Sequence, residues 1–512
     1  MNINNSVIFG FNGSIMVTAD NGSNNNNRKL NLFKWHINIP FEPQEYTPRI
    51  SLFIIAIIIK LAASAVSGIA YVFNNSMLYI LGIMFWLLWF FFLFIIALPQ
   101  IDNWLQKSSE RLKKTARKIV IIVVIIGIVE CIGLAVIGLD TIVSKQGEHF
   151  PEVLTSLNES FNYNDATALC HQAAENFLDG KNPYAEAHIV NAMQEYDVPL
   201  HKLTPLRLGI FNDTFPYPTD EQMQELHQRI LENPDDIPEE LESGLCYPAG
   251  SFLIPSLFLL LGISDLRIIY IILLVPALLY VIWLSPAKYR LLLLAIILIS
   301  LELWNALASG ETGFLLFPFL LLGWVLFKKH TLVSAISIGL AVTIKQVAWF
   351  FWPFYLILIY KTQGFKKAVQ SLSIILLIFI ATNLPFIISD PYLWYESIIS
   401  PMTDKFPLGV GIITLVTGGL INIQSSLVFS ILECLIFIGG IIWYYRNCYR
   451  YPHAGPLLAV LPLFFAWRSI WPYFFYFDII IIASIIINEY AKQTCHPYDL
   501  ALKGRNNPVK AL

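Results

Sequence analysis

Two cations in this 512-residue chain, Lys345 and Arg468, are candidates to bind an anionic ligand. Each follows a long apolar run, at the end that the topology derived below places outside. Lys and Arg are usually enriched on the cytoplasmic side, so a cation in this position needs an anionic partner. That partner is either a carboxylate of an acidic loop or a phosphate, which the planar fork of Arg binds with two hydrogen bonds. The residue types alone leave both interpretations open.

Asp165 is the acid whose surroundings stand out most. It lies in the first turn of a helix that we predict over 164–180, because apolar residues recur there at intervals of three and four. Asn164 can cap the start of this helix and Gly180 can end it. The helix dipole favours the ionised form of Asp165. An acid at this position also fits a purely structural role, which is to start the helix.

A second helix is predicted at about 219–232. It begins with Thr219 and Gln222 in the spacing of a capping box and stops at Asn233 before a proline. Its acidic face is typical of a solvated surface, and we interpret 186–245 as a surface elaboration.

The composition places these residues in a membrane protein. Hydrophobic residues make up 56% of the chain and charged residues 13%, about half of the roughly 25% found in soluble domains. The sequence therefore predicts an all-α polytopic membrane protein. No basic patch is large enough to bind nucleic acid, so we expect no such partner.

Charge asymmetry organises the apolar runs into a topology. If the basic clusters around 107–118, 328–329, 361–367 and 446–450 are cytoplasmic, about twelve spans alternate and both termini are cytoplasmic. Two shorter stretches, 251–263 and 410–422, suit re-entrant or interfacial helices. The acidic loop 140–250 is then extracytoplasmic. The twelve predicted spans are 50–73, 77–98, 119–139, 268–284, 290–308, 313–327, 331–346, 347–361, 368–389, 427–445, 454–467 and 472–489.

Four regions follow from this topology. Residues 1–48 are polar and Asn-rich, which predicts a disordered cytoplasmic tail. Residues 49–118 hold two N-terminal spans, 119–490 form the main membrane domain with the loop 140–250, and 491–512 are a cytoplasmic tail.

Ionisable residues inside the spans are the remaining candidates. We expect Lys60 to snorkel or to serve helix packing, whereas Glu302, Glu433 and Asp478 either line a cavity or pair with neighbours. Cys170 and Cys246 share the loop, where a disulfide and two unpaired thiols are both compatible with the sequence. No metal-ligand cluster is visible, so we expect no cofactor, although a divalent metal at a phosphate stays open.

Several motifs, in order over about 119–490, resemble the GT-C glycosyltransferases, in particular glycosyltransferase family 87, whose members use polyprenyl-phosphate mannose. The likeness departs at the two additional N-terminal spans, at Cys170-His171, at Glu311 where Gln is usual, and in the large insertion 186–245. The motifs are the loop Asp165 with the helix ending in Gly180-Lys-Asn-Pro-Tyr184, the Tyr247-Pro-Ala249 step, Ser309-Gly-Glu-Thr-Gly313, Lys345 with Pro353, and Arg468-Ser-Ile-Trp-Pro-Tyr473.

The resemblance implies a GT-C-like fold in the plasma membrane and an inverting hexosyl transfer. The sugar, mannose by analogy, would pass from a polyprenyl-phosphate donor to a lipid or glycan acceptor on the extracytoplasmic face. Asp165 would be the general base, with Asp140, Asp179 and Asp213 as fallbacks, and Lys345 and Arg468 would bind the donor phosphate. Residues implied to contact substrate are Asn182, Tyr184, Tyr247, Glu311 and Tyr473.

Two other functions compete with this one. A multi-pass transporter or lipid flippase fits the number of spans, but such proteins commonly show two similar halves, which this sequence lacks. An assembly protein would bind a partner through the loop, and would tolerate replacement of Asp165, Lys345 and Arg468.

Overall fold

The computed structural model describes residues 48–73, 76–105, 162–233, 238–399 and 405–490. It also describes two short antiparallel strands, β1 (Ile8–Phe9) and β2 (Ile15–Met16), with Ile8 opposite Met16. The predicted third span, Asp140, most of the tail 1–48 and the tail 491–512 lie outside the described residues.

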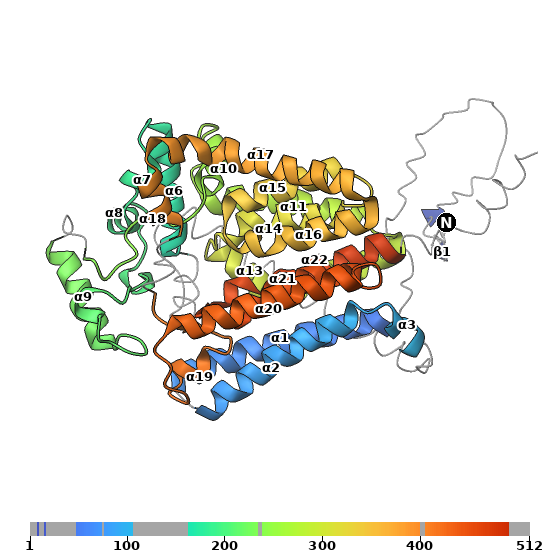
Figure 1. The fold of residues 1–512 in the computed structure, drawn as a ribbon, viewed down its shortest axis with the longest axis horizontal. Coiled ribbons are helices and arrows are strands. Elements are labelled where there is room, and N and C mark those ends of the chain that lie inside the picture. Colours follow the sequence, from blue (N-terminus) through green and yellow to red (C-terminus); the bar gives the residue numbers. More distant parts are fainter. Residues whose placement is uncertain are drawn as a thin grey trace, which may run out of the picture.

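The described part of the chain is a mostly helical membrane protein (Figure 1), as the composition predicts. Six of its helical segments are long and apolar enough to cross a membrane, or seven if a bent pair counts as one span. The six are segments of α1 (Pro48–Phe73), α2 (Ser76–Ile96), α11 (Leu266–Leu284), α17 (Phe365–Ser389) and α20 (Ser426–Asn447), and Trp471–Tyr490, which contains η5 (Trp471–Tyr473), α22 (Phe477–Ile485) and the π-helical turn η6 (Ile486–Tyr490).

Shorter helices fill the rest of the bundle. They are α3 (Gln100–Leu105), α10 (Gly250–Leu259), α12 (Ala287–Ile299), α13 (Leu301–Ala308), α14 (Gly313–Val325), α15 (Thr331–Ile344), α16 (Val347–Gln363), α18 (Pro391–Ile398), α19 (Thr414–Thr417), η4 (Pro452–Ala454) and α21 (Gly455–Phe464).

The predicted count of twelve spans is therefore not confirmed. The predicted span 290–308 is broken at Ser300, where α12 and α13 meet at 53°. The Ser300 hydroxyl donates to the carbonyl of Ile296, a bond from a serine to the preceding turn that often bends helices. Helices α14 and α15 have 13 and 14 residues. They are about 20 Å long at 1.5 Å per residue, less than the roughly 30 Å of a bilayer core.

The two stretches judged too short to span differ from each other. Residues 251–263 contain all but the first residue of α10, a ten-residue helix about 15 Å long, which is less than the thickness of a bilayer core. Residues 410–422 form turns and the four-residue α19 rather than an interfacial helix. Glycines explain the second case, because Gly409 and Gly411 bring the backbone against the segment 464–469.

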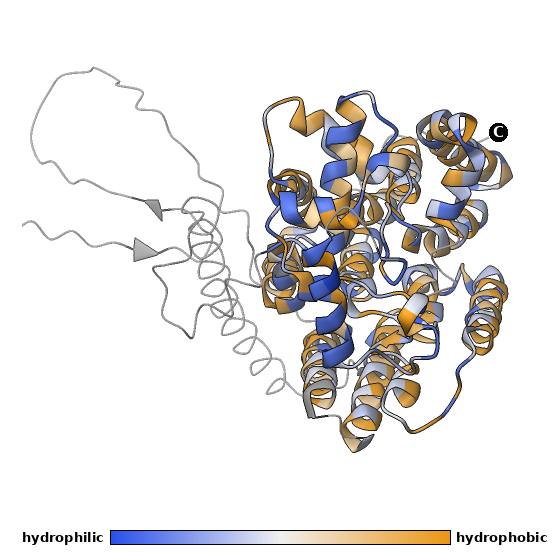
Figure 2. Cartoon of the chain, turned by 90° about the vertical axis from the view of Figure 1, so that its left-hand side faces the viewer, coloured by the Kyte–Doolittle hydropathy of each residue, from blue (hydrophilic) through white to orange (hydrophobic). Residues whose placement is uncertain are grey.

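A polar unit covers one end of the bundle, which we call the loop end. Figure 2 shows its hydrophilic helices in front of the largely hydrophobic ones. The predicted cap by Asn164 and the predicted capping box of Thr219 and Gln222 are both confirmed. Gly180, with φ of +76°, follows the first helix. The unit comprises α6 (Asp165–Leu178), α7 (Pro183–Glu186), α8 (Ile189–Glu195), η1 (Leu200–Lys202), η2 (Gly209–Phe211) and α9 (Asp220–Glu232).

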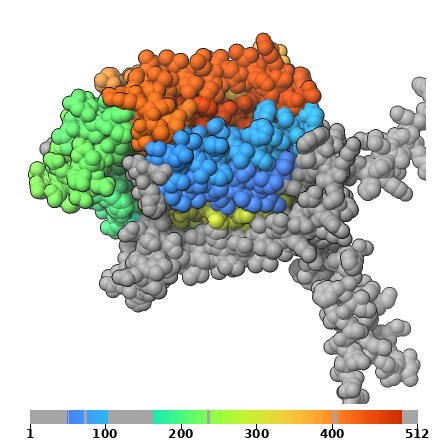
Figure 3. Space-filling view, turned by 90° about the horizontal axis from the view of Figure 1, so that it is seen from below, coloured from blue at the N-terminus to red at the C-terminus, as the bar shows by residue number. Residues whose placement is uncertain are grey.

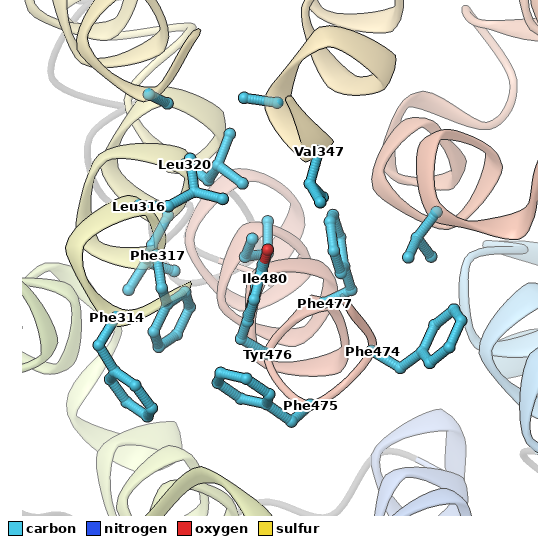
Figure 4. Packing of buried hydrophobic residues seen from close by; sticks show 14 of the residues in the cluster. Phe314, Leu316, Phe317, Leu320, Val347, Phe474, Phe475, Tyr476, Phe477 and Ile480 are labelled. Atoms are coloured by element: carbon cyan, nitrogen blue, oxygen red, sulfur yellow. The ribbon is translucent and has the colours of Figure 1, made fainter. Parts of the chain in front are cut away.

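The buried segment from Phe474 through α22 lies at the centre of the bundle (Figure 4). Phe475 stacks on Phe314 and Tyr476 on Phe317, with ring centroids 5.1 and 5.2 Å apart. Aromatic pairs at this separation add to the stabilisation from burial alone. Helix α14 is thereby fixed against the segment that follows Arg468.

Helices α1 and α2 lie alongside the C-terminal helices (Figure 3). Lys60 of α1 is fully buried, and its Nζ lies 2.6 Å from Asp478 of α22 and 3.6 Å from Glu302 of α13. Lys60 also donates to the carbonyl of Phe475 at 3.2 Å. Lys60 thus serves helix packing, one of its two expected roles, and does not snorkel.

Candidate active site

A cavity of about 370 Å³ lies where the loop-end unit meets the bundle. Six of the residues that the family resemblance assigns to catalysis or substrate binding line it together, although they are far apart along the chain. They are Asp165, Tyr247, Glu311, Lys345, Arg468 and Tyr473.

Asp165 is held at this cavity by two hydrogen bonds. The amide of Ala166 donates to Oδ1 at 2.7 Å, and the hydroxyl of Thr204 donates to Oδ2 at 2.5 Å. Burial raises the pKa of Asp165, the nearby Glu242 raises it further, and the Thr204 hydrogen bond and Arg468 act in the opposite direction. The site therefore holds a carboxylate with enhanced affinity for a proton.

Thr204 and Glu242 come from the segment 186–245, so its interpretation as a surface elaboration was wrong. The backbone amide of Glu242 donates to the carbonyl of Thr204 at 3.2 Å, within a short antiparallel pairing that includes Pro205 and Leu241. This pairing presents both side chains to the cavity.

Lys405 is a further cation of the cavity that the sequence interpretation missed. Its Nζ lies 2.6 Å from Oε1 of Glu242, and its backbone forms a bridge with Leu206. Lys405 and Arg468 hold the pKa of Glu242 below its ordinary value despite burial. Lys405 lies in the predicted extracytoplasmic connection 390–426, so the signal that identified Lys345 could also have found it.

Lys345 follows α15 and is buried. Its Nζ donates to the hydroxyl of Thr312 at 2.6 Å and lies 5.1 Å from the centroid of the Tyr247 ring, within cation–π range. The adjacent Glu311 has a pKa that burial raises, while Lys345 opposes the shift. Thr167 of α6 donates to the carbonyl of Gly310, which fixes the Glu311 turn beside Asp165.

Arg468 is positioned by a short parallel pairing of β3 (Leu408–Gly409) with β4 (Arg468–Ser469). A Cβ on Gly409, where φ is +139°, would lie 2.2 Å from the carbonyl oxygen of Ser469. A Cβ on Gly411 would lie 2.1 Å from the carbonyl oxygen of Phe464. Only glycine permits this approach at either position.

The Arg468 side chain makes no hydrogen bond or ion pair with any other residue that the structure describes. Its electrostatic partners across the cavity are Asp165 and Glu242. A cavity cation without a directly bonded partner is available to an anionic ligand.

The other predicted site residues lie elsewhere. Asn182 caps α7, and the Tyr184 hydroxyl donates to the carbonyl of Tyr247 at 3.1 Å, so these two support the cavity wall without lining it. The fallback Asp179 is exposed beside Lys181, at the far end of α6 and about 20 Å along the helix from Asp165.

The structure also places Asp213 and the two loop cysteines, Cys170 and Cys246. Asp213 is exposed on the loop-end unit, away from the cavity lining. Cys170 and Cys246 are both free thiols, so of the two interpretations the structure has the unpaired one. Within the described ranges, no group of three or more His, Cys, Asp or Glu side chains is arranged to hold a metal ion.

The intramembrane acids fall into two groups. Glu433 of α20 lines the cavity, together with Ser430. Glu302 and Asp478 do not line it, and instead surround Lys60.

Comparison of the chain with protein-family models, with curated proteins and with solved structures found no match.

Proposed function

We propose that the protein is an integral-membrane glycosyltransferase that moves a sugar from a polyprenyl-phosphate donor to a lipid or glycan acceptor. Mannose is the sugar that we propose, by analogy with family 87. We place the reaction on the extracytoplasmic face. The observation that carries the proposal is the cavity, which the half-buried Asp165 lines together with Arg468, Lys405 and Lys345.

These groups suit a single inverting displacement. Asp165 would accept the proton of the acceptor hydroxyl as its oxygen forms a bond to the anomeric carbon. The bond from that carbon to the phosphate oxygen breaks, and its electron pair stays on the phosphate. Arg468 would bind the phosphate with its fork, and Lys345 and Lys405 would stabilise the negative charge that develops.

The dimensions and lining of the cavity agree with this substrate class. A volume of about 370 Å³ is within the range of small-molecule sites, and it accommodates a sugar phosphate rather than a whole lipid. The part of the lining from α16, α21 and the turn before Arg468 is apolar, which suits the start of an isoprenoid chain. This apolar part comprises Val347, Phe350, Leu463 and Ala466.

The test is transfer of labelled sugar from a polyprenyl-phosphate donor by the full chain in reconstituted membranes. Loss of a general base costs about 10²- to 10⁴-fold in rate, which we expect for Asp165→Asn. Asp179→Asn is the matched control, because it alters an exposed acid on the same helix. Full activity of Asp165→Asn, with normal expression, would exclude Asp165 as the base. Absence of transfer by the wild type with every donor would contradict the proposal.

A further inference from the structure

Helix α20 forms one wall of the cavity and is the least buried of the candidate spans. Only 6% of its apolar window is buried inside the protein, whereas 89% of the window that contains α22 is. Leu427, Ile431 and Leu435 point outward with more than half of their surface exposed. A single helix layer therefore separates this part of the cavity from the surrounding lipid in a membrane.

Aromatic contacts attach α20 to the bundle on both sides of a short polar stretch. Toward the loop end, the Phe429 and Trp467 rings lie 5.4 Å apart. Farther along the helix, the Phe437 ring lies 5.1 Å from Phe350. Ser430 and Glu433 lie between these contacts, three positions apart and thus on one face of the helix, and both line the cavity.

Glu433 has no bonded partner in the described part of the chain. It makes no hydrogen bond or ion pair there, whereas the Ser430 hydroxyl donates to the carbonyl of Ser426 at 3.2 Å. Glu433 lies seven residues into α20, about 10 Å along the helix. A carboxyl group at such a depth is costly, and no cation of the described residues forms an ion pair with it, in contrast to Asp478 with Lys60.

This carboxyl group needs a partner that donates a hydrogen bond. The proposed polyprenyl-phosphate sugar has no O–H or N–H group at that depth. An isoprenoid chain below its phosphate is hydrocarbon only. A glycan without a lipid would be held at the polar, loop-end part of the cavity, where Asp165, Glu242 and Glu311 lie.

We propose that Glu433, with Ser430, binds a hydroxyl group on a membrane lipid that enters the cavity along α20, and that the acceptor is such a hydroxyl-bearing lipid. Only the statement that this lipid is the acceptor depends on the proposed function. The binding site itself stands on the cavity lining and on the unpaired carboxyl group.

The experiment measures lipid binding directly, without sugar transfer. The full chain in phosphatidylcholine nanodiscs is offered dioleoylglycerol, which has one free hydroxyl group, or its O-methyl ether, and bound lipid is counted by native mass spectrometry. The wild type should prefer dioleoylglycerol by on the order of tenfold, because its hydroxyl group can donate a hydrogen bond that the methyl ether cannot. Glu433→Leu should abolish the preference, and Glu433→Gln should retain part of it.

The matched control is Leu435→Ala, which alters a lipid-facing residue of the same helix and should leave the preference intact. Equal binding of the two lipids by the wild type, or an unchanged preference in Glu433→Leu, overturns the site. A preference that needs Glu433 in a protein without transferase activity supports the site and contradicts only the enzyme. Sugar transfer without any preference contradicts only the site.

Discussion

Two groups of charged side chains in this protein, one in the bundle and one at the cavity, differ in what surrounds them. In the bundle, Lys60 is enclosed by Asp478 at 2.6 Å and Glu302 at 3.6 Å, and none of the three lines the cavity at the loop end. In the cavity, Arg468 has no directly bonded partner among the described residues, and Asp165 is bonded only to neutral donors. Charges that satisfy one another hold helices together, whereas charges left facing a cavity are available to a ligand.

This difference separates structural residues from functional ones in a membrane protein, where every intramembrane charge is a candidate at first. Lys60 joins α1 to α13 and α22, and so attaches the two N-terminal helices to the bundle. Four variants test the comparison, in order of the size of effect that we expect.

Lys60→Met should destabilise the protein most. Removing one member of a buried ion pair leaves its partner uncompensated, which costs about 3–5 kcal/mol in the free energy of unfolding. The measurement is thermal unfolding of the full chain in detergent. Lys60→Met with Asp478→Asn should recover part of the loss, because Asp478 is then neutral and only Glu302 remains without its cation. Equal stability of wild type and Lys60→Met would show that the cluster does not hold α1 in place.

Arg468→Gln should have the opposite profile, with little change in unfolding and a large loss of activity. Removing one group that stabilises charge in the transition state costs about 10²- to 10³-fold in kcat. Arg468→Lys should recover only part, because an ammonium lacks the planar fork. The measurement is kcat and KM for the polyprenyl-phosphate donor. Wild-type kinetics in Arg468→Gln would remove Arg468 from phosphate binding.

Local sequence signals predicted the parts of the site that depend on neighbouring residues. The α6 helix with Asn164 and the Thr219 capping box follow from spacing alone, and they agree with the structure. Lys345 and Arg468 stood out because a cation at the loop end opposes the general distribution of charge. Their presence in one cavity with Asp165 depends on helix packing, which no local pattern contains.

The contacts that sequence reasoning missed join distant segments. Thr204 reaches Asp165 across 39 positions, and Lys405 reaches Glu242 across 163. The predicted number of spans was not confirmed for a related reason, because hydropathy does not indicate where a serine bends a helix. Glu302 and Asp478 could not be separated from Glu433 until the position of Lys60 was known.

Gly409→Ala should have an intermediate effect, since it acts on Arg468 through the backbone. A Cβ at this position collides with the Ser469 carbonyl, and φ of +139° is strained for alanine. The strain costs on the order of 1–3 kcal/mol, and separation of β3 from β4 displaces Arg468. We expect a higher KM for the donor. Gly419→Ala is the control, because that glycine also has a positive φ, of +71°, but a Cβ there contacts nothing. Equal increases in KM for the two variants would show that backbone strain, and not the contact with Ser469, causes the effect.

We expect the smallest effect from Glu242→Gln, which should move the pH dependence of activity to lower pH. Activity requires ionised Asp165, so it falls as the pH decreases through the pKa of that group, which burial and the charge of Glu242 raise. Lys405 and Arg468 hold the pKa of Glu242 low, so Glu242 is still ionised where Asp165 titrates. Removing its charge lowers the pKa of Asp165.

The acid limb of the plot of kcat/KM against pH should therefore move to lower pH in Glu242→Gln. Loss of Glu242 also leaves Lys405 without its carboxylate, and a freed cation shifts the limb in the same direction. Glu239→Gln is the control, since that exposed acid does not line the cavity. A limb that stays in place or moves to higher pH would mean that Asp165 is not the group whose ionisation limits the reaction, and the cavity acids would then resemble the Lys60 cluster in being structural.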